Sequence, residues 1–305
     1  MPIQLEGPRH GKGRVRLLKV TRLPEKHLVS EIKAEILVEG SNQTAFLDGD
    51  NVAVLPTDTI KNTVHALAKK HDYGSIEEFA VILAKHYVLA HPSVIQHAKV
   101  KLVEVQWERL VVKDTHGALK PHRHAFVQSG TDSRYAIAEA RLTSPGNVDV
   151  SLSAGLDGLR VLKTTESAFV GFFKDQYTTL PEVADRLLAT AVSANWQYSH
   201  PNATSSEAAQ VRAILLETFA GPADTGVPSP AVQYTLFKMG EAVLQRCPFV
   251  TKIHIYMPNI HNLPVNLAPF GLKNLHPHGE IFLPTDEPHG IIEATITRTE
   301  TASRL

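Results

Sequence analysis

In the first half of the chain, the pattern of apolar and polar positions changes from a period of two to the period of a helix and back again. Ile32, Ala34, Ile36 and Val38 alternate with charged neighbours, with Leu37 as the one exception, which is typical of an antiparallel strand with one buried face. The expected strands cover 15–22, 31–39, 100–107 and 124–128, and the expected helices cover 58–70 and the segment after Ser75. This second helix begins at a capping box formed by Ser75 and Glu78.

The second half of the chain shows nearly the same order of patterns. The expected strands cover 135–142, 148–163, 253–257 and 291–297, and helices are expected to begin at Thr179, Thr204 and Ser229. The first two of these helices carry capping boxes, closed by Glu182 and Glu207, and Pro181 stands in the first turn of the first one.

The two halves therefore predict a duplicated strand-strand-helix-helix-strand-strand unit, with one copy at 1–132 and the other at 133–305. Pro92 and Pro248 each follow the second helix of a pair, which supports this alignment. Chance similarity between two amphipathic helices is the alternative explanation.

The predicted class is α+β with antiparallel sheets. Helices on one face of such a sheet leave the other face to be covered by another subunit, so we expect a homo-oligomer.

Charge and composition narrow the possible partners. The chain has 305 residues, with 31 Lys and Arg balanced by 31 Asp and Glu, so no overall charge favours nucleic acid or an anionic membrane. No apolar run approaches the ~20 residues that span a bilayer, and the first residues lack the apolar core of an export signal. The single cysteine, Cys247, excludes an internal disulfide, and its sequence context favours a buried structural thiol over a nucleophile.

Motifs for nucleotide cofactors, serine hydrolases and zinc proteases do not occur in the sequence. His122 and His124 have a spacing that would suit a metal on one face of a strand, but no third ligand is evident. Hydrogen-bonding histidines are the favoured interpretation there, and the loop at His276–His278 gives no stronger signal. We therefore expect no metal site.

Several polar residues stand at predicted helix starts and strand ends. Thr57–Asp58 and Gln233 lie in first helical turns, whose amides are free to bind an anion. Arg186 is expected on a helix, where an arginine is usually a surface residue. Asn259 and His261 follow a strand and alternate, so they are expected to point to the same side, and His261 would act as an acid or base near neutral pH.

Several segments, in order along nearly the whole chain, resemble the urate oxidase family. Residues 159–186 are similar to the long signature of that family, with its spacing of Lys163, Phe169, Tyr177, Leu180 and Arg186. Further matches are Pro56–Thr63, Met257–His261, Val232–Met239 and His10–Arg16. Two positions depart from the family pattern, because His10 replaces a Tyr and Ile260 replaces a Lys. The first departure leaves Lys12 in place, and the second changes the charge near His261.

The resemblance implies the tunnelling fold (T-fold): two tandem ββααββ units per chain, helices on the outer face, and a homotetrameric barrel around a central tunnel. It implies active sites at subunit interfaces, each using Thr57 and Asp58 of the neighbouring subunit. It also implies that urate is oxidised by dioxygen without any cofactor, giving 5-hydroxyisourate and hydrogen peroxide.

The resemblance also assigns roles to individual residues. The catalytic set would be Lys12, Thr57 and His261. The substrate-binding set would be Arg186, Gln233 and Val232 on the pyrimidine side, Phe169 stacked on the ring, Leu180 as a wall, and Thr57 and Asp58 on the imidazole side. Asn259, with Thr57, would hold dioxygen and later water.

Two other functions stay open from the residues alone. One is another purine or pterin enzyme of the same fold, of a kind that often needs zinc; the other is a non-catalytic oligomer that binds a purine.

The C-terminal residues Ser303-Arg304-Leu305 resemble a peroxisomal targeting signal. We therefore expect an intracellular protein, cytoplasmic in a bacterium or peroxisomal in a eukaryote.

Overall fold

A computed structural model describes residues 3–275 and 279–299 of the chain, which divides into two compact units. Unit 1 comprises Met1–Gly155 with Gln197–Ala208, and unit 2 comprises Leu156–Trp196 with Ala209–Leu305. Each unit combines β-strands with long helices, and the strand pairs within each unit are antiparallel. The predicted α+β class is confirmed.

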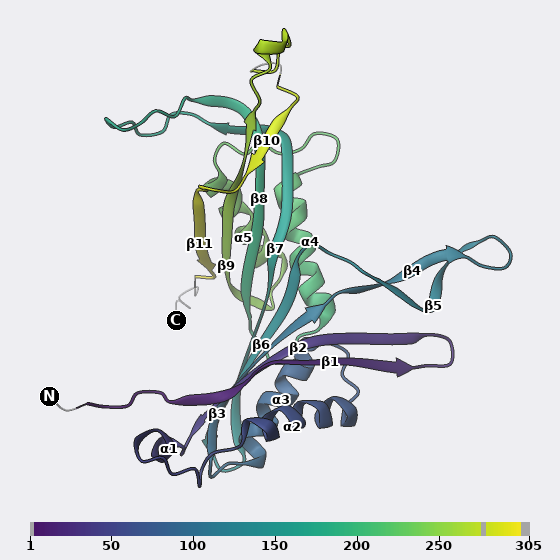
Figure 1. Cartoon of the computed structure of the whole chain (residues 1–305), viewed down its shortest axis with the longest axis vertical. Helices are drawn as coiled ribbons and strands as arrows, with labels where there is room; N and C mark the ends of the chain where they lie inside the picture. The colour runs from purple at the N-terminus through teal and green to yellow at the C-terminus, as the bar shows by residue number, and fades with distance from the viewer. Residues whose placement is uncertain (1–2, 276–278, 300–305) are drawn as a thin grey trace, which may run out of the picture. The chain divides into compact units, whose positions relative to one another are not determined.

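Unit 1 is a sheet with helices against one face (Figure 1). Its strands, in spatial order, are β1 (Arg9–Arg22), β2 (His27–Gly40), β3 (Ile95–Val105), β6 (Ser133–Ser144) and the first part of β7 (Asn147–Phe169). Its helices are the short α1 (Gln43–Leu47), α2 (Thr57–Lys70) and α3 (Ile76–Ala90). Strands β4 (Trp107–Lys113) and β5 (Leu119–Gln128) form a separate hairpin that extends away from this sheet.

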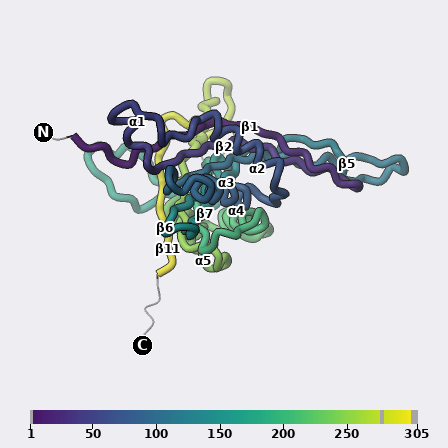
Figure 2. Tube along the Cα trace, turned by 90° about the horizontal axis from the view of Figure 1, so that it is seen from below, coloured from purple at the N-terminus to yellow at the C-terminus, as the bar shows by residue number. Residues whose placement is uncertain are grey.

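The core of unit 1 follows from the alternation read in the sequence. Ile32 and Ile36 of β2 are fully buried, whereas Lys33 and Glu35 between them are exposed on the other face. Helix α2 packs on β1 and α3 packs on β3 and β6, and the two helices lie on one side of the sheet in both views (Figure 2). Tyr87 of α3 is fully buried, and its hydroxyl donates a 2.8 Å hydrogen bond to the Ile60 carbonyl of α2.

Unit 2 has the same kinds of element. Its strands are the second part of β7, β8 (Val183–Tyr198), β9 (Val250–Pro264), β10 (Phe282–Thr285) and β11 (Ile291–Thr297), with β10 and β11 both paired with β9. Its helices are α4 (Ser205–Ala220), whose first turn belongs to unit 1, α5 (Val232–Arg246) and the single-turn η1 (Ala268–Phe270). The predicted inward stripe of α4, from Val211 to Phe219, is buried, and so is Cys247 at the end of α5.

The helix predicted from Thr179 is wrong. Residues 180–182 are irregular, and Val183 begins the long strand β8, so Arg186 lies on a strand. From Leu188 onward every second residue of β8 is buried, which is the period-two pattern of a sheet. Glu182 caps no helix; its carboxylate pairs with Lys174 at 2.7 Å.

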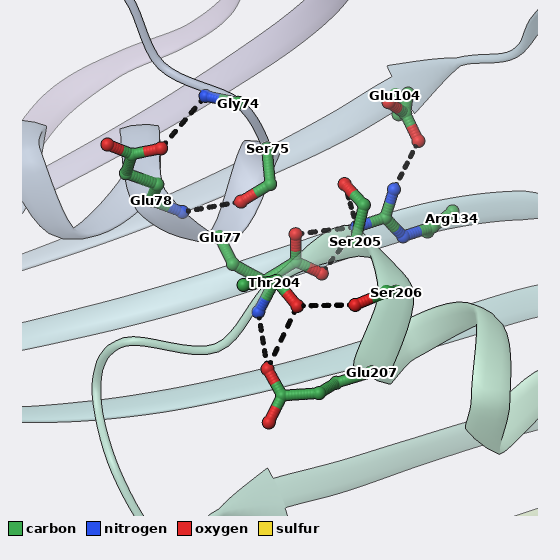
Figure 3. A network of polar contacts seen from close by, with 10 residues as sticks. All are labelled: Gly74, Ser75, Glu77, Glu78, Glu104, Arg134, Thr204, Ser205, Ser206 and Glu207. Carbon is green, nitrogen blue, oxygen red and sulfur yellow. Dashed lines mark hydrogen bonds and ion pairs between the residues drawn. The ribbon is translucent and has the colours of Figure 1, made fainter.

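The other capping boxes are confirmed. In the first, Ser75 Oγ accepts a hydrogen bond from the Glu78 amide at 3.1 Å. In the second, the Glu207 carboxylate accepts one from the Thr204 amide at 2.7 Å. Between these two helix starts lies a buried ion-pair network within unit 1 (Figure 3). Its centre is Arg134, whose guanidinium bonds Glu77 at 2.5 Å and Glu104 at 2.7 Å.

Two features singled out in the sequence, His276–His278 and Ser303-Arg304-Leu305, lie outside the described residues. Among the residues that are described, no helix is both long enough and apolar enough to cross a membrane.

Candidate active site

In unit 2, an arginine lies over an aromatic ring at the ends of two strands. The Arg186 guanidinium of β8 is 5.4 Å from the ring centre of Phe169 at the end of β7, and that ring stacks on Phe172 at 4.7 Å. Arg186 Nε is buried and has no hydrogen-bond partner, and burial lowers the pKa of this arginine. A buried guanidinium N–H without an acceptor is costly, so this corner suits a ligand that brings an acceptor and a flat ring.

The start of helix α5 supplies unpaired amides in the same unit. The helix begins at Val232 after Ala231, and no side chain caps it. Val232 is buried, Gln233 is exposed, and both lie in the first turn, where backbone N–H groups lack helical acceptors. Just before the helix, the Ser229 carbonyl accepts a 3.0 Å bond from the Ala168 amide, next to Phe169. The helix start is therefore tied to the strand that carries the ring.

Asn259 and His261 lie two residues apart on β9, which places them on the same face, as predicted. The Asn259 amide donates to the Gly290 carbonyl at 2.9 Å, whereas its side-chain Oδ1 is buried and has no hydrogen-bond partner. His261 is half-buried and pairs in register with Thr285 of β10. The face of β9 thus carries a second polar atom that lacks a partner.

Leu180 lies in the segment between β7 and β8 and is 52% exposed. Tyr177 of the same segment is 80% exposed. Two large apolar side chains left open in the connection between Phe169 and Arg186 are consistent with a surface that contacts a ligand or another chain.

In unit 1, Lys12 lies where β1 passes unusually close to β2. A side chain on the preceding Gly11 would meet the Ile36 carbonyl oxygen at 1.8 Å, so only glycine fits there. The β1–β2 register shifts between Lys12 and Val15, and Arg14 in that bulge has a φ of 57°. The bulge changes the direction of β1 directly after Lys12.

Thr57 and Asp58 form the first turn of α2, and no side chain caps this helix. Both residues are exposed. The Lys61 ammonium, 2.5 Å away, lowers the pKa of Asp58, with smaller contributions from Asn62 and Lys12.

His10, one of the two departures from the family pattern, connects the strand that carries Lys12 with the segment before α2. Its Nε2 lies 2.9 Å from the Leu55 carbonyl, two residues before Thr57, and its Nδ1 lies 2.8 Å from the Asn42 side-chain nitrogen. Because an acceptor and a donor face the two ring nitrogens, the neutral ring with hydrogen on Nε2 satisfies both contacts. His10 thus fastens the strand of Lys12 to the turn that leads to Thr57.

The two histidines considered for a metal lie side by side, with ring centres 4.6 Å apart. His122 Nδ1 accepts a 3.2 Å bond from the His124 amide. Within the residues that the structure describes, no group of three or more His, Cys, Asp or Glu side chains is arranged to hold a metal ion.

The sequence and the fold both match known proteins. The sequence profile of the family described as Uricase matches residues 8–139 and 152–293. Uricase-2 of Phaseolus vulgaris is 40% identical over 301 residues, covering 95% of this chain and 94% of the relative. The crystal structure of uricase from Arthrobacter globiformis aligns with a TM-score of 0.87 at 36% identity, covering 100% of this chain and 98% of that one.

The chain belongs to the uricase family. The resemblance read from the signature at 159–186 is thereby confirmed. A uricase from Arabidopsis thaliana is 41% identical over 303 residues, again with 95% of this chain covered.

Two polar residues within the signature of this uricase-family chain received no role from the sequence. Asp185 precedes Arg186 and accepts hydrogen bonds from Thr165 and from the Glu166 amide, at 2.9 and 2.8 Å. Lys163 donates to the Val227 carbonyl at 2.6 Å. The polar run from Lys163 to Ser167, at and beyond the end of the strand predicted at 148–163, was the available signal for Lys163.

Proposed function

We propose that this chain is a urate oxidase that holds the urate anion between Arg186 and the first turn of α5, with Phe169 stacked on the purine ring. The observation that carries this proposal is the unpartnered, buried Arg186 Nε above the Phe169 ring. An anionic, planar purine brings both the acceptor and the ring that this corner lacks.

The pyrimidine side of urate offers carbonyl oxygens and ring N–H groups. Arg186 would donate to one carbonyl oxygen, the Val232 amide to another, and the Gln233 side chain would bond the remaining edge. Leu180 would close the side of the pocket. These four residues and Phe169 belong to unit 2, which supports their acting as one clamp, the urate clamp.

The proposed catalytic groups come from both units. Lys12, Thr57 and Asp58 belong to unit 1, whereas Asn259 and His261 belong to unit 2. We propose that each active site combines the unit 2 residues of one subunit with the Thr57 and Asp58 of its neighbour in a homotetramer.

The open edge of the unit 1 sheet at β1, and the charged face of β2 opposite the helices, support closure into a barrel with a water-filled centre. The chain would supply two tandem T-fold repeats, predicted at 1–132 and 133–305. The antiparallel pairing of β6 with β3 favours including β6 in the first repeat.

The proposed reaction needs proton transfer and dioxygen. Lys12, through the Thr57 hydroxyl, would take a second proton from the urate monoanion, and His261 would assist. The electron-rich dianion then gives two electrons to dioxygen, forming a hydroperoxide at C5. Hydrogen peroxide leaves and a water molecule adds at C5, so urate, O2 and water give 5-hydroxyisourate and H2O2. Asn259, whose Oδ1 lacks a partner, would hold first dioxygen and then water together with Thr57.

Because the dianion is itself a strong reductant, the protein needs only to position the reactants, move protons and stabilise charge. We therefore propose that the reaction uses no metal or organic cofactor.

We also propose peroxisomal targeting through Ser303-Arg304-Leu305 if the source is a eukaryote, and a cytoplasmic location if it is a bacterium.

The test is turnover of urate by the purified protein after chelation and with no addition. The expected result is loss of the ultraviolet absorbance of urate, with one peroxide formed per urate and one O2 consumed. Protein that binds urate without consuming oxygen would instead be a purine-binding oligomer. Activity that appears only when zinc is added back would indicate another enzyme of the same fold.

A further inference from the structure

The polar residues around the left-handed turn at Glu166 have no role in the substrate contacts proposed above. Glu166 has a φ of 59°, a conformation that non-glycine residues rarely adopt. Its amide donates to Asp185 Oδ1 at 2.8 Å, and the neighbouring Thr165 hydroxyl donates to Asp185 Oδ2 at 2.9 Å. One carboxylate therefore holds the turn of β7, and it comes directly before Arg186 on β8.

The same turn also holds the segment that leads into α5. The Ser229 amide donates to the Glu166 carbonyl at 2.7 Å, and the Ser229 carbonyl accepts from the Ala168 amide at 3.0 Å. Ser229 is 1% exposed, and its hydroxyl accepts a 2.8 Å bond from Thr235 in the first turns of the helix. The turn thus joins three segments: one carries Phe169, one carries Arg186 and one begins α5.

Lys163 fastens the third segment from the strand. Its ammonium donates to the Val227 carbonyl at 2.6 Å and to the Ser229 hydroxyl at 3.2 Å. It also lies 5.3 Å from the centre of the Phe219 ring. Burial lowers the pKa of Lys163, and the nearby Glu166 carboxylate opposes this shift. The Lys163 ammonium therefore bonds the loop before α5.

Unit 1 contains the same arrangement at the corresponding place. Lys19, in the first strand of unit 1, donates to the His71 carbonyl at 2.5 Å and lies 4.7 Å from the centre of the Tyr73 ring. It therefore fastens the loop between α2 and α3, just as Lys163 fastens the loop between α4 and α5.

The two helix starts differ in one respect. The first turn of α3 is capped by the Ser75 hydroxyl, whereas α5 follows Ala231 and has no side-chain cap. The lysine of unit 2 therefore positions a helix start whose amides are left for another acceptor, and the lysine of unit 1 positions one that is already satisfied.

We propose that Asp185 and Lys163 are positioning residues of the urate clamp: through the turn at Glu166 they hold Phe169, Arg186 and the first turn of α5 in one geometry. This inference rests on the proposed function, since the clamp is defined by its affinity for a purine anion. Neither residue is proposed to touch the substrate.

The test uses the full-length protein with the substitutions Asp185→Asn and Lys163→Met. Measurements are kcat and KM for urate, the Kd of xanthine, and the melting temperature. Xanthine has the pyrimidine edge of urate but lacks the 8-oxo group. Lys19→Met is the matched control for the lysine. Asp114→Asn is the control for the aspartate, because the Asp114 carboxylate also holds a turn: it accepts two backbone amide bonds between β4 and β5.

Loss of clamp geometry should raise KM and the Kd of xanthine by about tenfold in both test variants, with kcat within about threefold of wild type. The two controls should stay within about twofold of wild type for all three constants. In an Arg186→Ala background, Asp185→Asn should raise KM by less than about threefold, because the two residues act on the same contact.

Three results would overturn the inference. The first is an unchanged KM and xanthine Kd in both test variants. The second is a rise in KM for Asp185→Asn that is equally large with and without Arg186, and the third is an equal rise in KM in the control variants.

If Lys163→Met does not fold, Ser229→Ala removes only the hydroxyl that the lysine bonds, and the same criteria apply. Wild-type protein that neither oxidises urate nor binds xanthine would overturn the proposed function and the inference together. Wild-type turnover with unaffected variants overturns the inference alone.

Discussion

Replacing Glu77 with alanine should destabilise unit 1 far more than breaking an ion pair of similar length at the surface. The Glu77 side chain is 0% exposed and the Arg134 side chain 16% exposed, and both Glu77 oxygens lie 2.5 Å from one guanidinium nitrogen (Figure 3). Without Glu77, the guanidinium keeps Glu104 as a charged partner at 2.7 Å. Removing one partner of a buried pair costs about 3–5 kcal/mol, because the remaining charge is poorly solvated.

The matched control is Glu217→Ala. Glu217 bonds Arg246 at 2.7 Å, a similar distance, but the two side chains are 58% and 51% exposed. Such a pair contributes about 0–1 kcal/mol. Comparing the two variants therefore tests whether burial, rather than distance, sets the size of the effect.

The assay is urea unfolding followed by circular dichroism, repeated at several protein concentrations so that any effect of association is visible, together with thermal melts. At about 2–4 °C per kcal/mol for large domains, Glu77→Ala should lower the melting temperature by about 6–20 °C, and Glu217→Ala by at most about 4 °C. If Glu77→Ala loses no more stability than Glu217→Ala, the argument from burial is wrong.

Three further predictions concern the site and the helix core. Arg186→Ala should weaken urate binding by about 1.5–3 kcal/mol through loss of a charge-assisted contact, seen as a higher KM; an unchanged KM would remove Arg186 from the clamp. Lys12→Met should lower kcat by about a hundredfold while leaving the Kd of xanthine near wild type, and near-normal turnover would exclude the lysine from proton transfer. Burial raises the pKa of Tyr87, so its neutral form favours the folded state; the stability it contributes is present below the unfolded pKa near 10 and is lost as pH rises above it. Tyr87→Phe should cost about 1 kcal/mol at neutral pH by removing the bond to Ile60, and it should flatten the loss of stability in alkaline melts; a wild-type profile with the same alkaline slope as the variant would contradict this.

Much of the fold was predictable because the period of the apolar pattern matched the final structure. The alternation of β2 and the capping boxes at Ser75 and Thr204 are local signals, and the structure keeps them. The helix predicted from Thr179 failed because Thr179, Pro181 and Glu182 imitate a helix start, whereas the residues after them alternate as a strand. The local signal was overridden by pairing within the sheet.

The site was predictable only in part. Residues in the family signature could be named, but the link from Glu166 to Ser229 joins segments more than sixty residues apart and depends on a left-handed backbone conformation. No periodicity in the sequence reports such a contact. The role of His10 was equally hidden, because its partners, Asn42 and Leu55, lie in the loops around α1.

The uncapped start of α5 has a consequence for attempts to make the protein more robust. A serine in place of Ala231 would occupy the position that Ser75 holds before α3, and such caps commonly add about 1 kcal/mol of stability. By analogy with Ser75, the new hydroxyl would accept from the Tyr234 amide and would stand directly beside the Val232 amide proposed to bind urate. Ala231→Ser should therefore yield a protein that melts later and works less well at low urate concentration. A screen that selects for heat resistance alone would therefore favour this change at the expense of catalysis.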